Sequence, residues 1–228
     1  MKKVVLLSLA IASVTTLRAQ TIAQWTFETS QPAATGTTLS VSPEVGTGTA
    51  TGLHASAATV FSTPSGNGSS HSFSANTWAV GDYYQFQTST LGFNNIGISY
   101  DQTSSATGPG RFDLAWSTDG TTFTPIATAN VIQVNGSPNV AWTPSSYNSL
   151  YLFTYDLSGV TALNNQAAVY FRLTDSATTS ANGGTVAAAG TDRVDNFTIG
   201  VVPLPEPTSV GLLLGGLGLV GWRLRRKK

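Results

Sequence analysis

The amino-acid sequence predicts an all-β protein, an antiparallel β-sandwich, and three observations support this. The middle of the 228-residue chain is rich in Gly, Ser, Thr and Asn, carries many aromatic residues and has no long apolar run at helical spacing, which favours strands joined by polar turns. About ten short segments show strand character, with no helical segments between them. The two ends have the composition of targeting segments, and the roughly 185 residues between them suffice for one domain with a core.

The expected strands are bounded by clusters of turn residues. They cover Ile22–Glu28, Thr59–Ser62, Ser70–Ser74, Tyr83–Thr88, Ile96–Gln102, Arg111–Ser117, Thr122–Ala127, Leu150–Asp156, Ala168–Thr174 and Arg193–Val201. The clearest local signal is a hairpin, because Phe112, Leu114 and Trp116 share one face at period two. The following Asp119-Gly120 pair suits the positive-φ turn of that hairpin.

Two stretches, residues 31–52 and 182–190, consist mainly of Thr, Ala, Gly and Ser with little apolar periodicity, and we expect loops there.

The chain has no cysteine, which excludes disulfides, thiolate metal sites and a cysteine nucleophile. Its formal net charge of zero is unevenly distributed, because the region from Gln20 to Pro205 contains three arginines and ten acidic residues, a net charge of −7. Such a surface repels phosphate backbones, so we expect no nucleic-acid partner, whereas divalent cations and neutral glycans are compatible with it.

The first 19 residues have the layout of a secretory signal peptide. Lys2 and Lys3 precede an apolar run over residues 4–14, and a more polar segment ends at Ala19, where we expect cleavage. The alternative, a buried N-terminal helix of the mature fold, would need a partner for an almost wholly apolar segment. The sequence therefore predicts an exported protein that begins with a signal helix.

The C-terminus combines a proline-rich spacer, a short apolar segment and a basic tail. Pro203, Pro205 and Pro207 disfavour a helix, and an uninterrupted apolar or glycine run follows over residues 210–222. The tail is basic at Arg223, Arg225, Arg226, Lys227 and Lys228. The positive-inside rule places these charges in the cytoplasm. As a transmembrane helix the run rises only about 20 Å against a hydrocarbon core of about 30 Å, which favours a transient anchor.

This tail resembles a known family of sorting signals. Residues 202–208 read VPLPEPT and precede the Gly/Leu-rich helix and the basic cluster, so residues 202–228 resemble the PEP-CTERM sorting domain of bacterial proteins handled by exosortases. The resemblance implies recognition and cleavage near Pro205, Glu206 and Pro207, with Glu206 as part of the recognised motif. It also implies the exosortase, the secretion machinery and the membrane as partners. The expected destination is the cell envelope or the exopolysaccharide matrix.

The region between the ends, residues 20–201, resembles in layout the lectin-like and galactose-binding-like β-sandwiches. This resemblance implies a jelly-roll variant of the sandwich. In such a fold the first and last strands lie together, which would pair Trp25-Thr26-Phe27 with the segment from Val194 to Ile199. The resemblance rests on layout and includes no diagnostic motif.

The sequence shows no catalytic constellation. His54 and His71 are the only histidines, each in a Ser/Gly/Ala-rich segment where we expect exposed loop or edge positions. Neither a Gly-x-Ser-x-Gly nucleophile motif nor a His-Glu-x-x-His zinc motif occurs. A glycosidase would need two facing carboxylates, for which Glu28 and an aspartate are available. We therefore expect a non-enzyme, and an uncharacterised hydrolase is the least favoured alternative.

Calcium is the only cofactor that the residues suggest. Asp192 and Asp195 lie at the start of the last strand and Asp175 ends another, so their oxygen atoms are candidate ligands at one rim of the sandwich. On one strand, however, Asp192 and Asp195 would point to opposite faces. Solvated acids, or an aspartate capping a turn, are the simpler explanation.

Aromatic residues outside the alternating core positions could stack on sugars. The residues outside those positions are Trp78, Tyr83, Tyr84, Trp142, Tyr147 and Tyr151. From them we select Trp78, Tyr84 and Trp142 as the candidates for glycan binding. Three hypotheses follow in order: a non-enzymatic surface or matrix protein that adheres to exopolysaccharide, a carbohydrate-binding module with structural calcium, and a hydrolase. A sheet face with several exposed aromatics would favour the second.

Overall fold

The computed structural model describes residues 20–202, which form one compact unit. This unit contains thirteen β-strands and two short 3-10 helices, Ser149–Tyr151 (η1) and Thr161–Leu163 (η2). Within these residues, no helix has the length and apolar character needed to cross a membrane. The predicted signal helix of residues 1–19 and the predicted C-terminal transmembrane helix lie outside the described residues.

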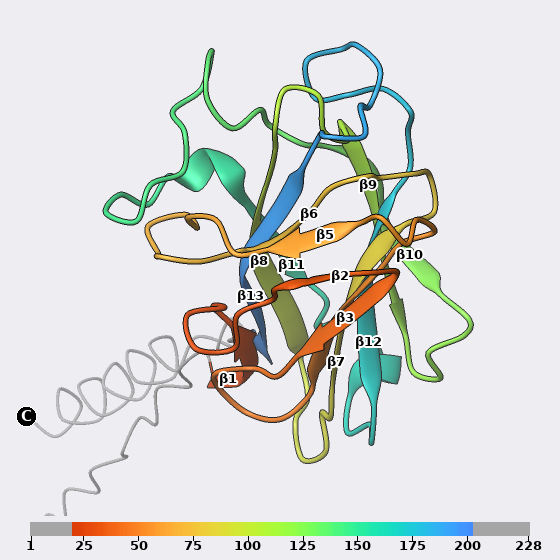
Figure 1. Ribbon diagram of the computed structural model, residues 1–228. Coiled ribbons are helices and arrows are strands. Elements are labelled where there is room, and N and C mark those ends of the chain that lie inside the picture. Colours follow the sequence, from red (N-terminus) through yellow and green to blue (C-terminus); the bar gives the residue numbers. More distant parts are fainter. Residues whose placement is uncertain (1–19, 203–228) are drawn as a thin grey trace, which may run out of the picture. The chain divides into compact units, whose positions relative to one another are not determined.

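The strands form two antiparallel sheets that enclose a common core, which confirms the predicted all-β sandwich (Figure 1). The seven-stranded sheet has the order β11 (Leu152–Asp156), β8 (Ile96–Ser104), β13 (Asp192–Val201), β6 (Phe73–Ala75), β5 (Val60–Ser62) and β2 (Ala34–Thr35), and β1 (Gln20–Trp25) also pairs with β13. The six-stranded sheet has the order β10 (Thr124–Val131), β9 (Arg111–Ser117), β12 (Val169–Asp175), β7 (Tyr83–Thr88), β4 (Thr49–Leu53) and β3 (Thr38–Val41).

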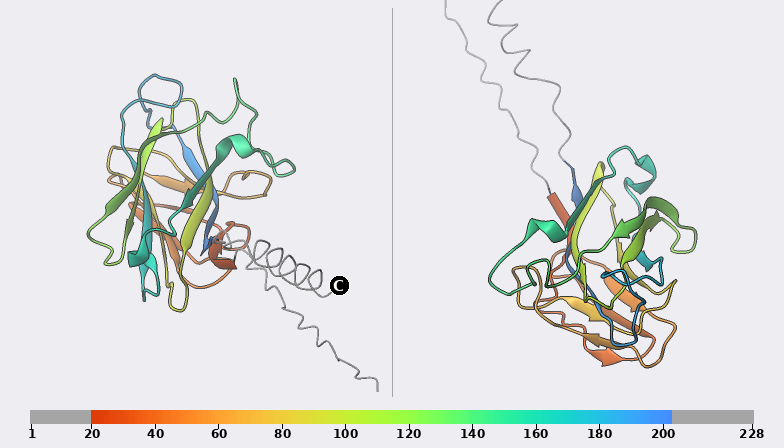
Figure 2. Two further views of the ribbon diagram at one scale, coloured as in Figure 1. Left: turned by 180° about the vertical axis from the view of Figure 1, so that it is seen from behind. Right: turned by 90° about the horizontal axis from the view of Figure 1, so that it is seen from above.

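Strand β13 joins the two ends of the fold. It pairs with β8 along one edge, and β6 and β1 share its other edge, with Asp192 opposite Ala75 and Trp25 opposite Phe197. In both views of Figure 2 the red β1 lies beside the blue β13. The predicted pairing of the first and last strands is confirmed, but of Trp25, Thr26 and Phe27 only Trp25 takes part, because β1 ends there.

The hairpin predicted around Asp119-Gly120 is also confirmed. Strands β9 and β10 pair with Thr124 opposite Trp116, and Gly120 has a φ of 73°. The Asp119 carboxylate accepts hydrogen bonds from the backbone N–H groups of Thr121 and Thr122, both at 2.8 Å. These bonds close the turn and set the register of the two strands.

Aromatic side chains join the two sheets across the core. The rings of Phe86 on β7 and Phe197 on β13 stack with their centroids 3.6 Å apart, and Trp25 packs edge-on against both. All three are fully buried. Because rings of this size contribute much of the apolar area that leaves water on folding, this contact anchors the sandwich.

The prediction of a loop over residues 31–52 is wrong for nearly half of this range, because β2, β3 and four of the five residues of β4 lie in it. The inward-facing residues of β4 are Ala50 and Gly52, so the strand has no apolar alternation to detect. A Cβ at Gly52 would lie 2.5 Å from Cε1 of Phe61, which leaves room only for glycine. The other predicted loop, 182–190, contains no strand.

Candidate functional site

The three aromatic residues predicted to stack on sugars are buried. Trp78, Tyr84 and Trp142 are 7%, 0% and 5% exposed. The Trp78 Nε1–H donates to the carbonyl of Ala75 at 2.9 Å, and the Tyr84 hydroxyl donates to the carbonyl of Asp192 at 3.0 Å. A ring can stack on a ligand only if one of its faces is open, so these residues form no binding platform. Trp78 and Tyr84 belong to the interior because their polar atoms find backbone partners there. Trp142 is buried edge-on against Tyr151, and its Nε1–H has no hydrogen-bond partner among the described residues.

A different aromatic group lies on the outer face of the six-stranded sheet. Alternation along β7 turns Tyr83, Gln85 and Gln87 outward, and the register places Gln85 opposite Arg172 of β12. The guanidinium carbon of Arg172 lies 4.0 Å from the ring centroid of Tyr83 and 3.7 Å from that of Phe123. Its Nε and Nη2 donate to the Gln85 side-chain oxygen at 3.1 and 2.7 Å. Two cation–π contacts and two hydrogen bonds thus fix one arginine.

Tyr170 extends this group along β12. It lies opposite Gln87, and its ring packs against Gly120 of the hairpin turn, where a Cβ would approach the ring carbons to 3.1–3.4 Å. We call this group the arginine face and define it as Tyr83, Gln85, Gln87, Phe123, Tyr170 and Arg172. All six side chains are partly exposed. Farther along the same sheet, the Ser40 and Thr51 hydroxyls form a hydrogen bond of 2.9 Å.

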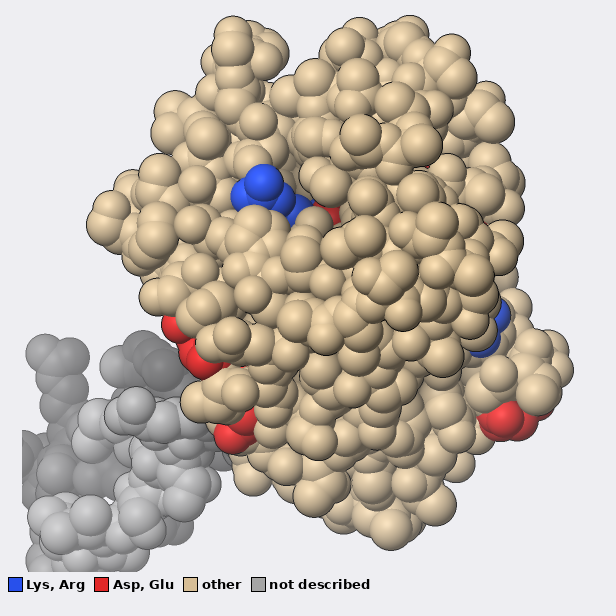
Figure 3. Space-filling view, viewed as in Figure 1, with Lys and Arg blue, Asp and Glu red and all other residues tan. Residues whose placement is uncertain are grey.

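The arginine face offers hydrogen-bond donors and acceptors beside ring surfaces. Among residues 20–202, no carboxylate forms an ion pair with Arg172, and its hydrogen bonds use only Nε and Nη2. Burial lowers the pKa of Arg172 from its usual value, although an arginine stays charged at any physiological pH. Charged side chains are sparse over the side of the molecule shown in Figure 3. The rings and hydrogen-bonding groups of the arginine face suit a polar, uncharged ligand with apolar faces.

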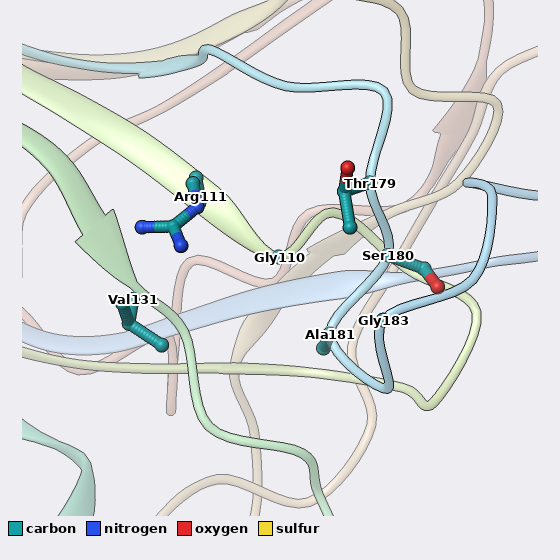
Figure 4. Close-up of a pocket in the computed structure, with 7 residues that line it drawn as sticks. All are labelled: Gly110, Arg111, Val131, Thr179, Ser180, Ala181 and Gly183. Atoms are coloured by element: carbon teal, nitrogen blue, oxygen red, sulfur yellow. The ribbon is translucent and has the colours of Figure 1, made fainter.

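A small pocket lies at the start of β9. It has a volume of about 160 Å³ and is lined by Gly110, Arg111, Val131, Thr179, Ser180, Ala181 and Gly183. Figure 4 shows the Arg111 and Val131 side chains on one side and the 179–183 loop on the other, with the guanidinium directed away from the loop. The volume falls below the roughly 300–1,000 Å³ of typical ligand pockets. We therefore place the candidate site on the sheet face.

The acidic residues predicted to bind calcium do not converge. Asp192 is fully buried on the inner face of its sheet, where its two carboxylate oxygens accept from Gln102 at 3.0 Å and Ser104 at 2.8 Å. Burial raises its pKa well above the ordinary range, and burial raises the pKa of Asp175 to about 6. Asp195 points to the opposite face. Residues 20–202 contain no group of three or more His, Cys, Asp or Glu side chains placed to hold a metal ion.

Asp195 lies beside a carboxylate that the sequence did not single out. Asp101 of β8 is its direct partner in the sheet, and these side chains are 0% and 1% exposed. The Asn196 side-chain amide donates to Oδ2 of both, at 2.9 Å to Asp101 and 3.2 Å to Asp195. Burial raises the pKa of Asp195 to about 7 and also raises that of Asp101. Only the strand register could have identified this pair.

The expectation of exposed histidines is wrong for His54. It is 2% exposed and lies between the rings of Phe61 and Trp78, with its Nδ1 3.2 Å from the Asp82 carboxylate. Burial lowers its pKa to about 4 despite the nearby negative charge. His71 is partly exposed, with its Nδ1 3.7 Å from the Glu28 carboxylate.

Comparison with known proteins supports the interpretation of the C-terminus. Residues 203–227 match the family described as the PEP-CTERM protein-sorting motif. The chain therefore carries a signal of proteins that are exported and held in the membrane during sorting. Pro205, Glu206 and Pro207 lie within the match but outside the described residues, as do the basic residues from Arg223 onward. No curated protein sequence matches the chain.

Solved structures with a similar fold include adhesin and carbohydrate-binding domains. The K2 cleaved adhesin domain of Lys-gingipain has 16% identity and a TM-score of 0.36, with 63% of this chain and 83% of that chain covered. The K1 domain from Porphyromonas gingivalis W83 has 12% identity and a TM-score of 0.41, with 78% and 97% covered. TmCBM61, solved with beta-1,4-galactotriose, has 8% identity and a TM-score of 0.32, with 66% and 85% covered. Because every TM-score is below 0.5 and every identity is below 25%, we draw no conclusion about this chain from these similarities.

Proposed function

We propose that this protein is exported, sorted by an exosortase and displayed in the cell envelope or the exopolysaccharide matrix as a non-enzymatic adhesive protein. The observation that carries this proposal is the sorting motif at residues 203–227, which directly follows a self-contained sandwich. The strand order β1-β13-β8-β11 in one sheet and β7-β12-β9-β10 in the other supports a jelly roll as its architecture. The exosortase, the secretion machinery and the membrane are the partners that sorting requires.

The non-enzymatic role is proposed from the chemistry of the described side chains. Of the two histidines, His54 is buried among aromatic rings and His71 lies beside Glu28. The buried carboxylates of Asp175 and Asp192 accept hydrogen bonds from protein groups. An adhesive role needs only a stable fold and an exposed surface, both of which the sandwich offers.

Localisation in a host with an exosortase system tests this proposal. Protease accessibility on intact cells should place the wild-type protein at the surface, and Glu206→Ala should reduce its surface level because the recognised motif is lost. Asp156→Asn is the matched control, since it removes an exposed acid outside the motif. A Glu206→Ala protein that reaches the surface as well as wild type would contradict sorting through this motif.

A second function, carbohydrate binding, is favoured by the arginine face. The rings of Tyr83, Phe123 and Tyr170 offer apolar surface, and Gln85, Gln87 and Arg172 offer hydrogen-bonding groups of the kind that sugar hydroxyls require. We assign neutral glycans as the ligand class. The described residues have a net charge of −7, which opposes the approach of an anionic polymer.

A glycan array with residues 20–202 tests the second function. We expect binding to neutral oligosaccharides that weakens at least about tenfold, or about 1.4 kcal/mol, in Tyr170→Ala and in Arg172→Gln. Tyr147→Ala is the matched control, because this tyrosine is 53% exposed and lies outside the arginine face. No binding to any neutral glycan, or binding that both variants retain, would refute the assignment.

A further inference from the structure

We infer that the outer face of the seven-stranded sheet holds a divalent cation of the calcium type between Asp101 of β8 and Asp195 of β13, under the loop of residues 66–71. This site differs from the one that the acidic residues suggested in sequence, because Asp175 and Asp192 take no part. It also lies on the opposite sheet from the arginine face. The cation site and the glycan-binding role of the arginine face can therefore be tested independently of each other.

The first argument is the convergence of two buried carboxylates. Asp101 and Asp195 are direct partners in the sheet, so both side chains stand on the same face. Their Oδ2 atoms approach the same amide group, that of Asn196. Neither carboxylate forms an ion pair within residues 20–202. Two adjacent buried carboxylates are costly in their ionised forms unless a positive charge compensates them.

The second argument is an unpartnered oxygen. Asp101 is only 1% exposed, and its buried Oδ1 makes no hydrogen bond to the described residues. Buried polar atoms are normally satisfied, so an orphan carboxylate oxygen at this place indicates a missing electropositive partner.

The third argument is the loop that covers Asp195. Its Oδ2 accepts from the Asn67 backbone N–H at 2.9 Å and from the Ser69 hydroxyl at 2.5 Å, and this hydroxyl also lies 3.2 Å from the carbonyl oxygen of His71. A Cβ at Gly66 would lie 2.2 Å from Asp195 Oδ2 and 2.3 Å from the His71 carbonyl oxygen. The loop therefore brings a hydroxyl and a carbonyl oxygen to the carboxylates, and calcium is bound by such hard oxygen ligands.

The side chain of Asn196 is positioned to add a further oxygen ligand to those of Asp101 and Asp195. It has a φ of +52° at the bulge that interrupts the pairing of β13 with β8, which directs its amide toward the two carboxylates. Rotating the amide by half a turn about the Cβ–Cγ bond would exchange its nitrogen for its oxygen. The same side chain can therefore donate to two carboxylates or coordinate a cation beside them.

The basic residue on this strand, Arg193, does not neutralise the two carboxylates. Arg193 precedes Asp195 by two residues and shares its face of the sheet, but its Nη1 donates to the Ser65 carbonyl at 3.4 Å. Glu28 adds a further acid near the loop, where its Oε1 accepts from the His71 N–H at 2.7 Å. The charge balance around the loop is thus negative, which favours a cation.

Thermal unfolding of chelator-treated residues 20–202 tests this inference, with calcium at up to about 10 mM, above the dissociation constants of extracellular calcium modules. At a calcium concentration a hundredfold above Kd, we expect Tm to rise by about 5–10 °C. Magnesium should act more weakly, because it demands stricter octahedral geometry. Asp101→Asn and Asp195→Asn should abolish the calcium response, whereas the matched control Asp192→Asn should keep it.

Isothermal titration calorimetry keeps the test independent of the variants' folding. Wild type should release or absorb heat with a one-to-one stoichiometry for calcium, even if Asp195→Asn fails to fold. The inference is overturned if wild type shows neither heat nor a shift in Tm at about 10 mM calcium. It is also overturned if folded Asp101→Asn and Asp195→Asn both respond as strongly as wild type.

Discussion

The contact between Arg172 and Phe123 provides a quantitative test of the arginine face. The guanidinium carbon lies 3.7 Å from the Phe123 ring centroid, and both side chains are partly exposed. Cation–π contacts contribute about 0.5–1 kcal/mol at exposed sites and about 2 kcal/mol when desolvated, so we expect a coupling of about 1 kcal/mol. A double-mutant cycle of Arg172→Ala and Phe123→Ala, measured by urea unfolding of residues 20–202, gives this coupling directly.

A second cycle supplies the matched control. Arg111 is exposed, and its guanidinium donates to the Ala129 carbonyl at 3.2 Å with no aromatic contact. Arg111→Ala combined with Phe123→Ala should therefore be additive within about 0.5 kcal/mol. If the Arg172 cycle gave no more coupling than the Arg111 cycle, the guanidinium would not be held by the ring, and a preorganised face would lose its basis.

Three further predictions concern stability. Burial raises the pKa of Asp175 to about 6 from the ordinary value of 3.8, so the folded state binds the proton more tightly and Asp175 makes stability fall as pH rises from about 4 to 6. Asp175→Asn should make this fall smaller in urea unfolding at each pH, with the remainder due to Asp101, Asp192 and Asp195, and an unchanged pH profile would contradict it. Gly52→Val should cost about 1–3 kcal/mol by overpacking against Phe61, and a wild-type Tm would refute the close approach. Phe197→Ala should cost about 3–5 kcal/mol in urea unfolding through loss of the Phe86 stack, and a cost below about 1 kcal/mol would contradict that stack.

Strands with strong alternation were predictable from the sequence. The bounds of β7 and β9 agree with the expectation residue for residue, because both strands alternate between a buried face and a partly exposed face. Strand β4 was missed since its inward residues, Ala50 and Gly52, are small. The aromatic side chains of Phe61 and Phe73 fill that space from the other sheet. The missing apolar signal is thus a consequence of packing between strands.

The candidate sites depend on which strands are neighbours, and strand pairing cannot be deduced from the sequence alone. Alternation alone places Tyr170 and Arg172 on one face of β12, but only the register brings Gln85 and Tyr83 beside them. The same holds for Asp101, which lies 94 positions from its partner Asp195. Trp78 and Tyr84 were misassigned because Trp and Tyr can satisfy their polar atoms with backbone groups in the interior.

The mass and C-terminal sequence of the protein recovered from outside the cytoplasm of its host test the central claim most directly. Cleavage by an exosortase within the sorting motif predicts a product that ends near Pro205, Glu206 and Pro207 and lacks the basic tail. Recovery of the surface protein with its C-terminus intact to Lys228 would contradict processing at this motif.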